Sequence, residues 1–166
     1  MPQRNISVVR EGITAGVIGA TAVAVWFLIV DTIAGHPFYT PTVLGEAVFG
    51  FFGPPAGETS AMHVIGYTFV HYAAFIALGT LLAFIVRRAE VDTGVLAGLL
   101  LLFVIFEVGF YGATALLSQW GRLGDLAWYQ VGAANLLAAG LMGNYIWRGH
   151  PALKQQFAYA LGGDER

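Results

Sequence analysis

Long apolar stretches separated by short polar connections make up the chain. Four of these stretches are long enough to cross a bilayer as α-helices, which takes about 20 predominantly apolar residues each. We therefore predict membrane spans at about 12–33, 61–86, 94–117 and 127–147. Because the spans and their connections use nearly the whole sequence, the pattern predicts one membrane domain over 1–166, an all-α bundle of four transmembrane helices.

Two further segments have helical patterns but are too short to span. In the connection after the first span, Thr40 and Pro41 resemble a helix cap and its first residue. The apolar residues after them predict a short outer interfacial helix: Val43, Leu44, Ala47, Val48 and Phe51. The region 151–161 follows the last span, and its apolar residues share one face, which predicts an amphipathic tail on the cytoplasmic leaflet: Leu153, Phe157 and Leu161.

The basic residues predict the orientation of the spans. Arg122 lies alone on one side, whereas the other basic residues flank the opposite ends of the helices: Arg4, Arg10, Arg87, Arg88, Arg148, Lys154 and Arg166. Lys and Arg are enriched in the cytoplasmic loops of membrane proteins. We therefore expect both termini on the cytoplasmic side.

Composition narrows the possible functions. Only 11% of the residues are charged, the mean hydropathy is +0.69, and the net charge is −2 without a basic run, which argues against nucleic-acid binding. With no cysteine, any metal chemistry rests on His and carboxylates. The sequence contains no phosphate-binding glycine loop, no Gly-x-Ser-x-Gly and no His-Glu-x-x-His, so we expect no enzyme activity.

Small residues form stripes along three of the predicted spans. In a bilayer, such stripes allow close backbone approach between helices. The first span has the longest stripe, and we expect it to have a tightly packed neighbour: Gly12, Gly16, Ala20 and Ala24. Shorter stripes occur on the third and fourth spans: Gly94 and Gly98, and Gly132, Asn135, Ala139 and Gly143.

Three polar residues approach the midplane of the predicted bilayer. At a rise of about 1.5 Å per residue, His71, Glu107 and Asn135 each lie several turns below the outer end of their helix. Tyr67 and Tyr111 lie one turn outward, so two polar ladders face each other if the second and third spans are antiparallel. A His71–Glu107 pair either fixes helix register or, with Asn135, Tyr67 and Tyr111, forms a proton, metal or small-ligand site.

Other histidines lie near the outer rim. Asp31, His36 and His63 carry ligand types that suit a divalent metal, but their spacing supports such a site weakly. We expect His63 to be a solvated interfacial residue. His71 or His63 would also serve as a haem ligand across a subunit interface. No cofactor is predicted from these residues.

Two stretches carry a family resemblance: EGITAGVIGATAVAVWFLIVDTIAGHPFYTPTVLG and HYAAFIALG. They resemble segments of small, uncharacterised bacterial integral membrane proteins with four predicted spans. The resemblance covers about the first half of the chain and implies the same fold in a bacterial inner (cytoplasmic) membrane. It implies no activity and no site residues.

Three functions are compatible with the sequence. Because no soluble domain or catalytic motif is present, our leading hypothesis is a non-catalytic accessory or structural subunit of a larger membrane complex, with an energy-converting complex as one candidate, or of a homo-oligomer. The second hypothesis is a self-contained protein that binds or transports a proton, a metal or a small ligand at the midplane residues. The third is a haem-binding membrane redox protein.

Overall fold

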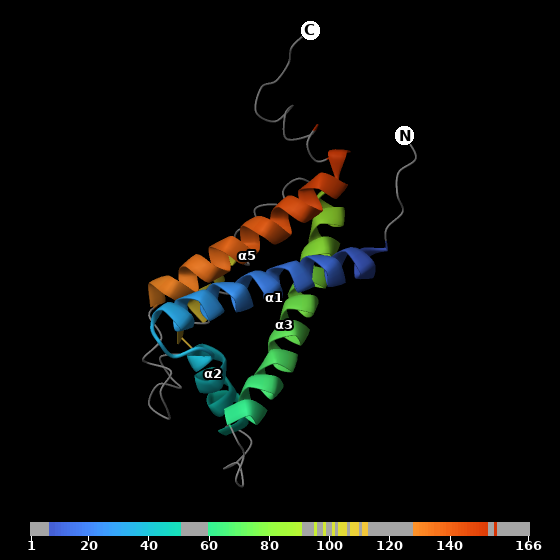
Figure 1. Ribbon diagram of the computed structural model, residues 1–166. Helices are drawn as coiled ribbons and strands as arrows, with labels where there is room; N and C mark the ends of the chain where they lie inside the picture. The colour runs from blue at the N-terminus through green and yellow to red at the C-terminus, as the bar shows by residue number, and fades with distance from the viewer. Residues whose placement is uncertain are drawn as a thin grey trace.

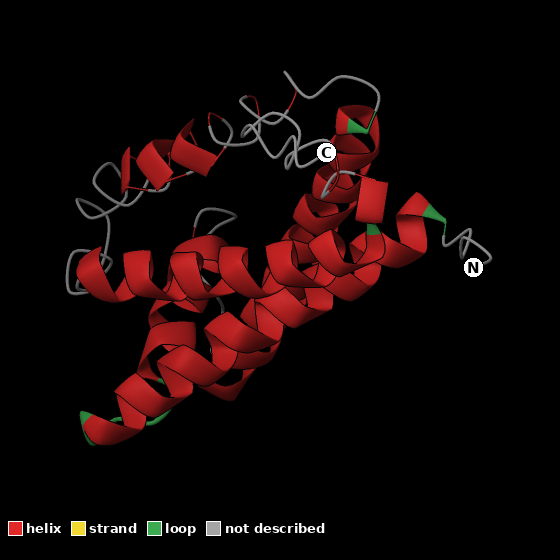
Figure 2. Cartoon of the chain, turned by 90° about the horizontal axis from the view of Figure 1, so that it is seen from above, coloured by secondary structure: helices red, strands yellow, loops and turns green. Residues whose placement is uncertain are grey.

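The computed structural model describes residues 7–50, 60–90, 128–152 and 155, together with part of the stretch 95–112. The described elements are all helices (Figure 2). They are α1 at Val8–Ile33, α2 at Tyr39–Gly50, α3 at Ser60–Ala89 and α5 at Trp128–Gly149. The residues described within 95–112 are helical as well. The prediction of an all-helical chain is therefore confirmed for this part.

The helices extend beyond their predicted bounds. The backbone N–H of Arg10 donates a hydrogen bond to Ser7 Oγ (3.3 Å), and this N-cap starts α1 ahead of the predicted first residue, Gly12. The short helix expected after Thr40 is present as α2. Much of the predicted third span and most of the predicted tail lie outside the described residues.

Two described helices are long and apolar enough to cross a membrane: α1 and the segment Ala61–Ala89 of α3. Only 33% and 17% of the residues in their most apolar windows are buried inside the chain. The core helix of a soluble protein has most of such a window buried. The large exposed apolar surface of these helices is therefore consistent with contact with lipid.

Helix α1 is central to the arrangement (Figure 1). It crosses α3 and runs antiparallel to α5, while α2 packs against the first part of α3 below the C-terminal end of α1. The first turn of α1 and the last turn of α5 lie at the same end of the molecule. The predicted placement of both termini on one side of a membrane stays a prediction.

Glycines bring the backbones of α1 and α3 into contact. A Cβ atom added to Gly16 would lie 2.5 Å from Ile76 Cα and would also meet the carbonyl oxygen of Phe75. A Cβ atom on Gly79 would lie 2.6 Å from Gly16 N. The prediction that the first span has a tightly packed neighbour is confirmed, and that neighbour is α3.

Among the described residues, the small-residue stripes on the later spans do not make such close backbone contacts. A Cβ atom added to Gly98 or Gly143 would meet no described atom within 4 Å, whereas one on Gly132 would lie 3.1 Å from the hydroxyl of Tyr111. Contact between α1 and α5 is instead made by side chains. Val23 and Phe27 of α1 pack with three residues of α5: Val131, Ala134 and Ala138.

Candidate functional site

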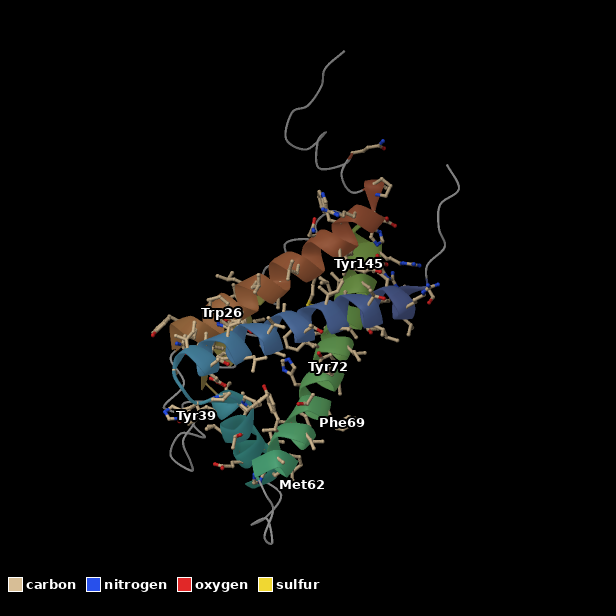
Figure 3. All side chains as sticks on the ribbon, viewed as in Figure 1. Trp26, Tyr39, Met62, Phe69, Tyr72 and Tyr145 are labelled. Atoms are coloured by element: carbon tan, nitrogen blue, oxygen red, sulfur yellow. The ribbon has the colours of Figure 1, made fainter. Side chains whose placement is uncertain are left out.

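A cavity of about 230 Å³ lies between α1, α2 and α3. Most of its surface is apolar, and α1 contributes Val23, Ala24 and Phe27 to it. The polar side chains that line it come from all three helices: Thr21, Asp31, Thr40, Tyr67, Thr68, His71 and Tyr72. Figure 3 shows Tyr72 on the part of α3 that approaches α1. A mainly apolar cavity with a few polar groups is typical of small-molecule sites.

His71 is the most deeply buried polar group on the α3 side of the cavity. Its side chain is 9% exposed, and its Nε2 lies 3.0 Å from the carbonyl oxygen of Ala20 on α1. Because a carbonyl oxygen only accepts, Nε2–H must donate. In the neutral imidazole, Nδ1 is then an acceptor. The rings of Tyr67 and Phe75 lie 5.6 and 4.8 Å from the imidazole, centroid to centroid, and help to hold its orientation.

A pair of hydroxyl groups bridges α1 and α3 next to His71. The hydroxyl oxygens of Thr21 and Tyr72 are 3.0 Å apart, and either one can be the donor. The two hydroxyls carry two hydrogens, of which their mutual bond uses one. The pair can therefore donate one further hydrogen bond.

Asp31 lies at the end of the cavity that is next to the C-terminal end of α1. It is 4% exposed, and its two carboxylate oxygens accept hydrogen bonds from Thr40 N and Thr40 Oγ1, both at 2.8 Å. A carboxylate that accepts from backbone N–H in the first turn of a helix stabilises that helix as a cap. Asp31 therefore fixes α2 against the end of α1.

The three residues of the predicted rim metal site have separate surroundings. Both carboxylate oxygens of Asp31 are bonded to Thr40, His36 is exposed, and His63 is 6% exposed beneath α2, with its ring 6.3 Å from that of Phe49. The expectation of a solvated His63 is wrong, because α2 covers this residue. No group of three or more His, Asp or Glu residues in the described ranges suits a metal ion.

The predicted midplane residues fall into separate groups. His71 and Tyr67 line the cavity, whereas Tyr111 hydrogen-bonds to Glu107 and packs against the α1–α5 cluster. Asn135 is half-buried on α5. Because the described partner of His71 is Ala20, the pairing of His71 with Glu107 stays a prediction.

A second polar cluster, which the sequence analysis missed, joins the other ends of three helices. His150 follows α5 and is 6% exposed; its Nε2 lies 2.9 Å from Glu11 Oε1, and its Nδ1 lies 2.7 Å from Glu90 Oε1. Glu11 is buried in the first turn of α1, and Glu90 follows α3. The sequence predicts both termini on one side of a membrane, and this prediction could have indicated that these three residues lie at the same end of the helices.

The inner cluster of Glu11, Glu90 and His150 is suited to hold helix ends together. Each ring nitrogen of His150 lies within hydrogen-bond distance of one carboxyl oxygen, so this single side chain links Glu11 to Glu90. Because Nδ1 and Nε2 point to different sides of the ring, the two carboxylates do not converge with one nitrogen on a common metal position. We therefore interpret this cluster as a structural connection between α1, α3 and α5.

Comparison of the chain with protein-family profiles, with curated proteins and with solved structures finds no match. The resemblance to small bacterial four-span proteins thus stays a prediction.

Proposed function

We propose that this protein is a multi-pass membrane protein that binds a small, largely apolar molecule between α1, α2 and α3. The observation that carries the proposal is a cavity of about 230 Å³ with the nearly buried imidazole of His71 in its wall. A cavity of about 150 Å³ is enough to hold benzene in an apolar protein core. The space between α1 and α3 is therefore suited to a single ring or to the end of a longer molecule.

The surroundings of the cavity favour a ligand that arrives through the bilayer. Among its lining residues, three large apolar ones from α1 and the turn before α2 are partly exposed: Val25 at 48%, Leu28 at 41% and Phe38 at 52%. The cavity thus reaches a surface of α1 that is apolar. If α1 and α3 cross the membrane, this surface faces lipid, and a lipid-soluble molecule can reach His71 without passing through water.

We further propose the finer topology that the sequence predicts, with four spans, both termini in the cytoplasm and a location in the inner membrane of a bacterium. The charge pattern supports it, and the common position of the first turn of α1 and the last turn of α5 supports it too. An accessory role beside other subunits stays a second proposal. It is supported by the absence from the sequence of any catalytic motif or soluble domain.

The test is gentle extraction from native membranes, followed by identification of everything that remains bound. Solvent extraction and mass spectrometry report small molecules, and peptide analysis reports other chains. The proposal predicts one small apolar compound in about equal amount with the protein. Stoichiometric partner chains with no small molecule would support the accessory role instead, and a Soret band would support the haem hypothesis.

A matched pair of variants separates specific binding from lipid that remains associated with the protein. Ala24→Phe places a ring in the cavity, whereas Ala73→Phe makes the same change at an exposed position of α3 that does not line it. The compound should be lost from Ala24→Phe and retained by Ala73→Phe. Equal retention by the two variants would contradict the proposed site.

A further inference from the structure

We infer that the molecule bound in the cavity carries a neutral ring hydroxyl, as a phenol or a quinol does. This inference rests on the proposed ligand-binding function and adds the chemical class of the ligand. It follows from four properties of the cavity wall: a hydrogen-bond acceptor, a hydrogen-bond donor, aromatic side chains and the absence of a described cation.

The acceptor is Nδ1 of His71. Ala20 O takes the hydrogen on Nε2 at 3.0 Å, so a neutral imidazole has its lone pair on Nδ1. Among the described residues no hydrogen bond reaches this nitrogen, although the side chain is only 9% exposed and lines the cavity. A ligand that donates a hydrogen bond to this nitrogen would satisfy it and thereby gain binding free energy. A hydroxyl group is such a donor.

The donor is the Thr21–Tyr72 pair. Its mutual bond of 3.0 Å between α1 and α3 leaves one hydroxyl hydrogen, which can be donated to the oxygen of the ligand. A hydroxyl group can both donate and accept, so it offers His71 the hydrogen and this pair the oxygen that each lacks among the described residues. A plain hydrocarbon satisfies neither group.

The ring is favoured by the aromatic residues of the wall. Phe27, Tyr67 and Tyr72 line the cavity from two helices, and Phe38 lines it from the turn before α2. Aromatic side chains surround ring-shaped ligands favourably in edge-to-face and offset arrangements. The volume of about 230 Å³ leaves space for one ring with a substituent.

The charge of the wall favours a neutral ligand. None of the described residues that line the cavity is Lys or Arg, so nothing there neutralises a carboxylate or a phosphate. Both oxygens of Asp31 already accept hydrogen bonds from Thr40. A ligand ammonium group would have to compete with those two bonds, whereas a hydroxyl group does not.

The test compares three probes of similar size by ¹⁹F NMR on the full-length protein in detergent micelles. Fluorobenzene measures the apolar contribution, 4-fluorophenol adds the hydroxyl group, and 4-fluorobenzylamine adds a cation. Signals from the Ala24→Phe variant provide the correction for partition into micelles. We expect 4-fluorophenol to bind about tenfold more tightly than fluorobenzene, because only its hydroxyl group can form hydrogen bonds with the cavity wall.

The variant His71→Gln assigns this preference to Nδ1. Glutamine keeps an N–H donor for Ala20 O but has no acceptor at the position of Nδ1. It should remove the tenfold preference for 4-fluorophenol and leave fluorobenzene binding unchanged. The double variant Thr21→Val with Tyr72→Phe, which removes both hydroxyl groups of the donor pair, should reduce the same preference and provides a second test if His71→Gln does not fold.

The inference is overturned if wild type binds fluorobenzene and 4-fluorophenol equally, if both variants retain the preference, or if 4-fluorobenzylamine binds best. A different result would overturn the proposed ligand-binding function itself. In that case all three probes would bind equally to wild type and to the Ala24→Phe variant.

Discussion

Replacement of Gly16 by Ala tests the close contact between α1 and α3, the helices that form two of the cavity walls. The added Cβ would lie 2.5 Å from Ile76 Cα and 2.7 Å from Ile76 N, whereas ordinary contacts of a Cβ begin at 3.4 Å. Both opposing atoms belong to the backbone, so no side-chain rotation can make room. The helices must move apart by up to about 1 Å, which reduces dispersion contacts along the whole crossing.

The expected loss of stability follows from the same geometry. Overpacking of a well-packed core costs about 1–3 kcal/mol. Gly16→Ala also gains roughly 0.5–1 kcal/mol of helix propensity, which offsets part of this loss. Because backbone atoms limit relaxation at Gly16, we place the net destabilisation at about 2 kcal/mol. Reversible unfolding in mixed micelles, followed by circular dichroism, measures it.

Gly140→Ala is the matched control. A Cβ atom at Gly140 of α5 meets no described atom within 4 Å, so this variant should be as stable as wild type or slightly more stable. The Gly16→Ala variant should also lose affinity for the molecule bound in the cavity. If Gly16→Ala unfolds at the same denaturant concentration as Gly140→Ala, the close crossing of α1 and α3 is refuted.

Three further substitutions test other parts of the structure by the same unfolding measurement. Thr40→Val removes the hydroxyl group that donates to Asp31 at 2.8 Å and should lower the free energy of unfolding by about 2 kcal/mol. An unchanged unfolding midpoint would contradict the role of Asp31 in fixing α2. His150→Phe leaves the buried carboxylate of Glu11 without its donor and should destabilise by about 3 kcal/mol. The double variant with Glu11→Gln should recover part of that loss. If the two substitutions instead lower stability by the sum of their separate effects, the side chains of Glu11 and His150 are not coupled. Phe38 has a φ of 68°, so Phe38→Gly should relieve backbone strain and stabilise the fold by about 1 kcal/mol. A lower unfolding midpoint of this variant would contradict that expectation.

Local patterns in the sequence predicted the helices well. The Thr40-Pro41 pair preceded an apolar periodic stretch, and α2 occupies that place. The stripe that contains Gly12 and Gly16 marked the face of α1 that meets α3. These features depend on neighbours in sequence and on residue size, which a single chain displays directly.

The cavity could not be predicted from the same patterns. In a span that is apolar all round, periodicity does not fix which face turns inward, so the partner of His71 was open. The actual partner is the backbone carbonyl of Ala20, a group that every residue has and that no sequence motif marks. The wall formed by the end of α1 and the turn before α2, which includes Asp31 and Phe38, was missed for the same reason.

The inner cluster was missed for a different reason. Glu11, Glu90 and His150 each lie next to a helix end, where charged residues are usually solvated. Only the convergence of three helix ends buries Glu11 and His150 and brings the three side chains together. The charge pattern predicted these ends on one side of a membrane but carried no information on the lateral distances between the helices.

The most direct test of a ligand site between α1, α2 and α3 is a density map of the protein extracted gently from native membranes, with side chains resolved. The account predicts a compact density that does not belong to the chain, within hydrogen-bond distance of His71 Nδ1 and next to Tyr72. Side chains of α1 and α3 filling the space in front of His71, with no room for another molecule, would contradict it.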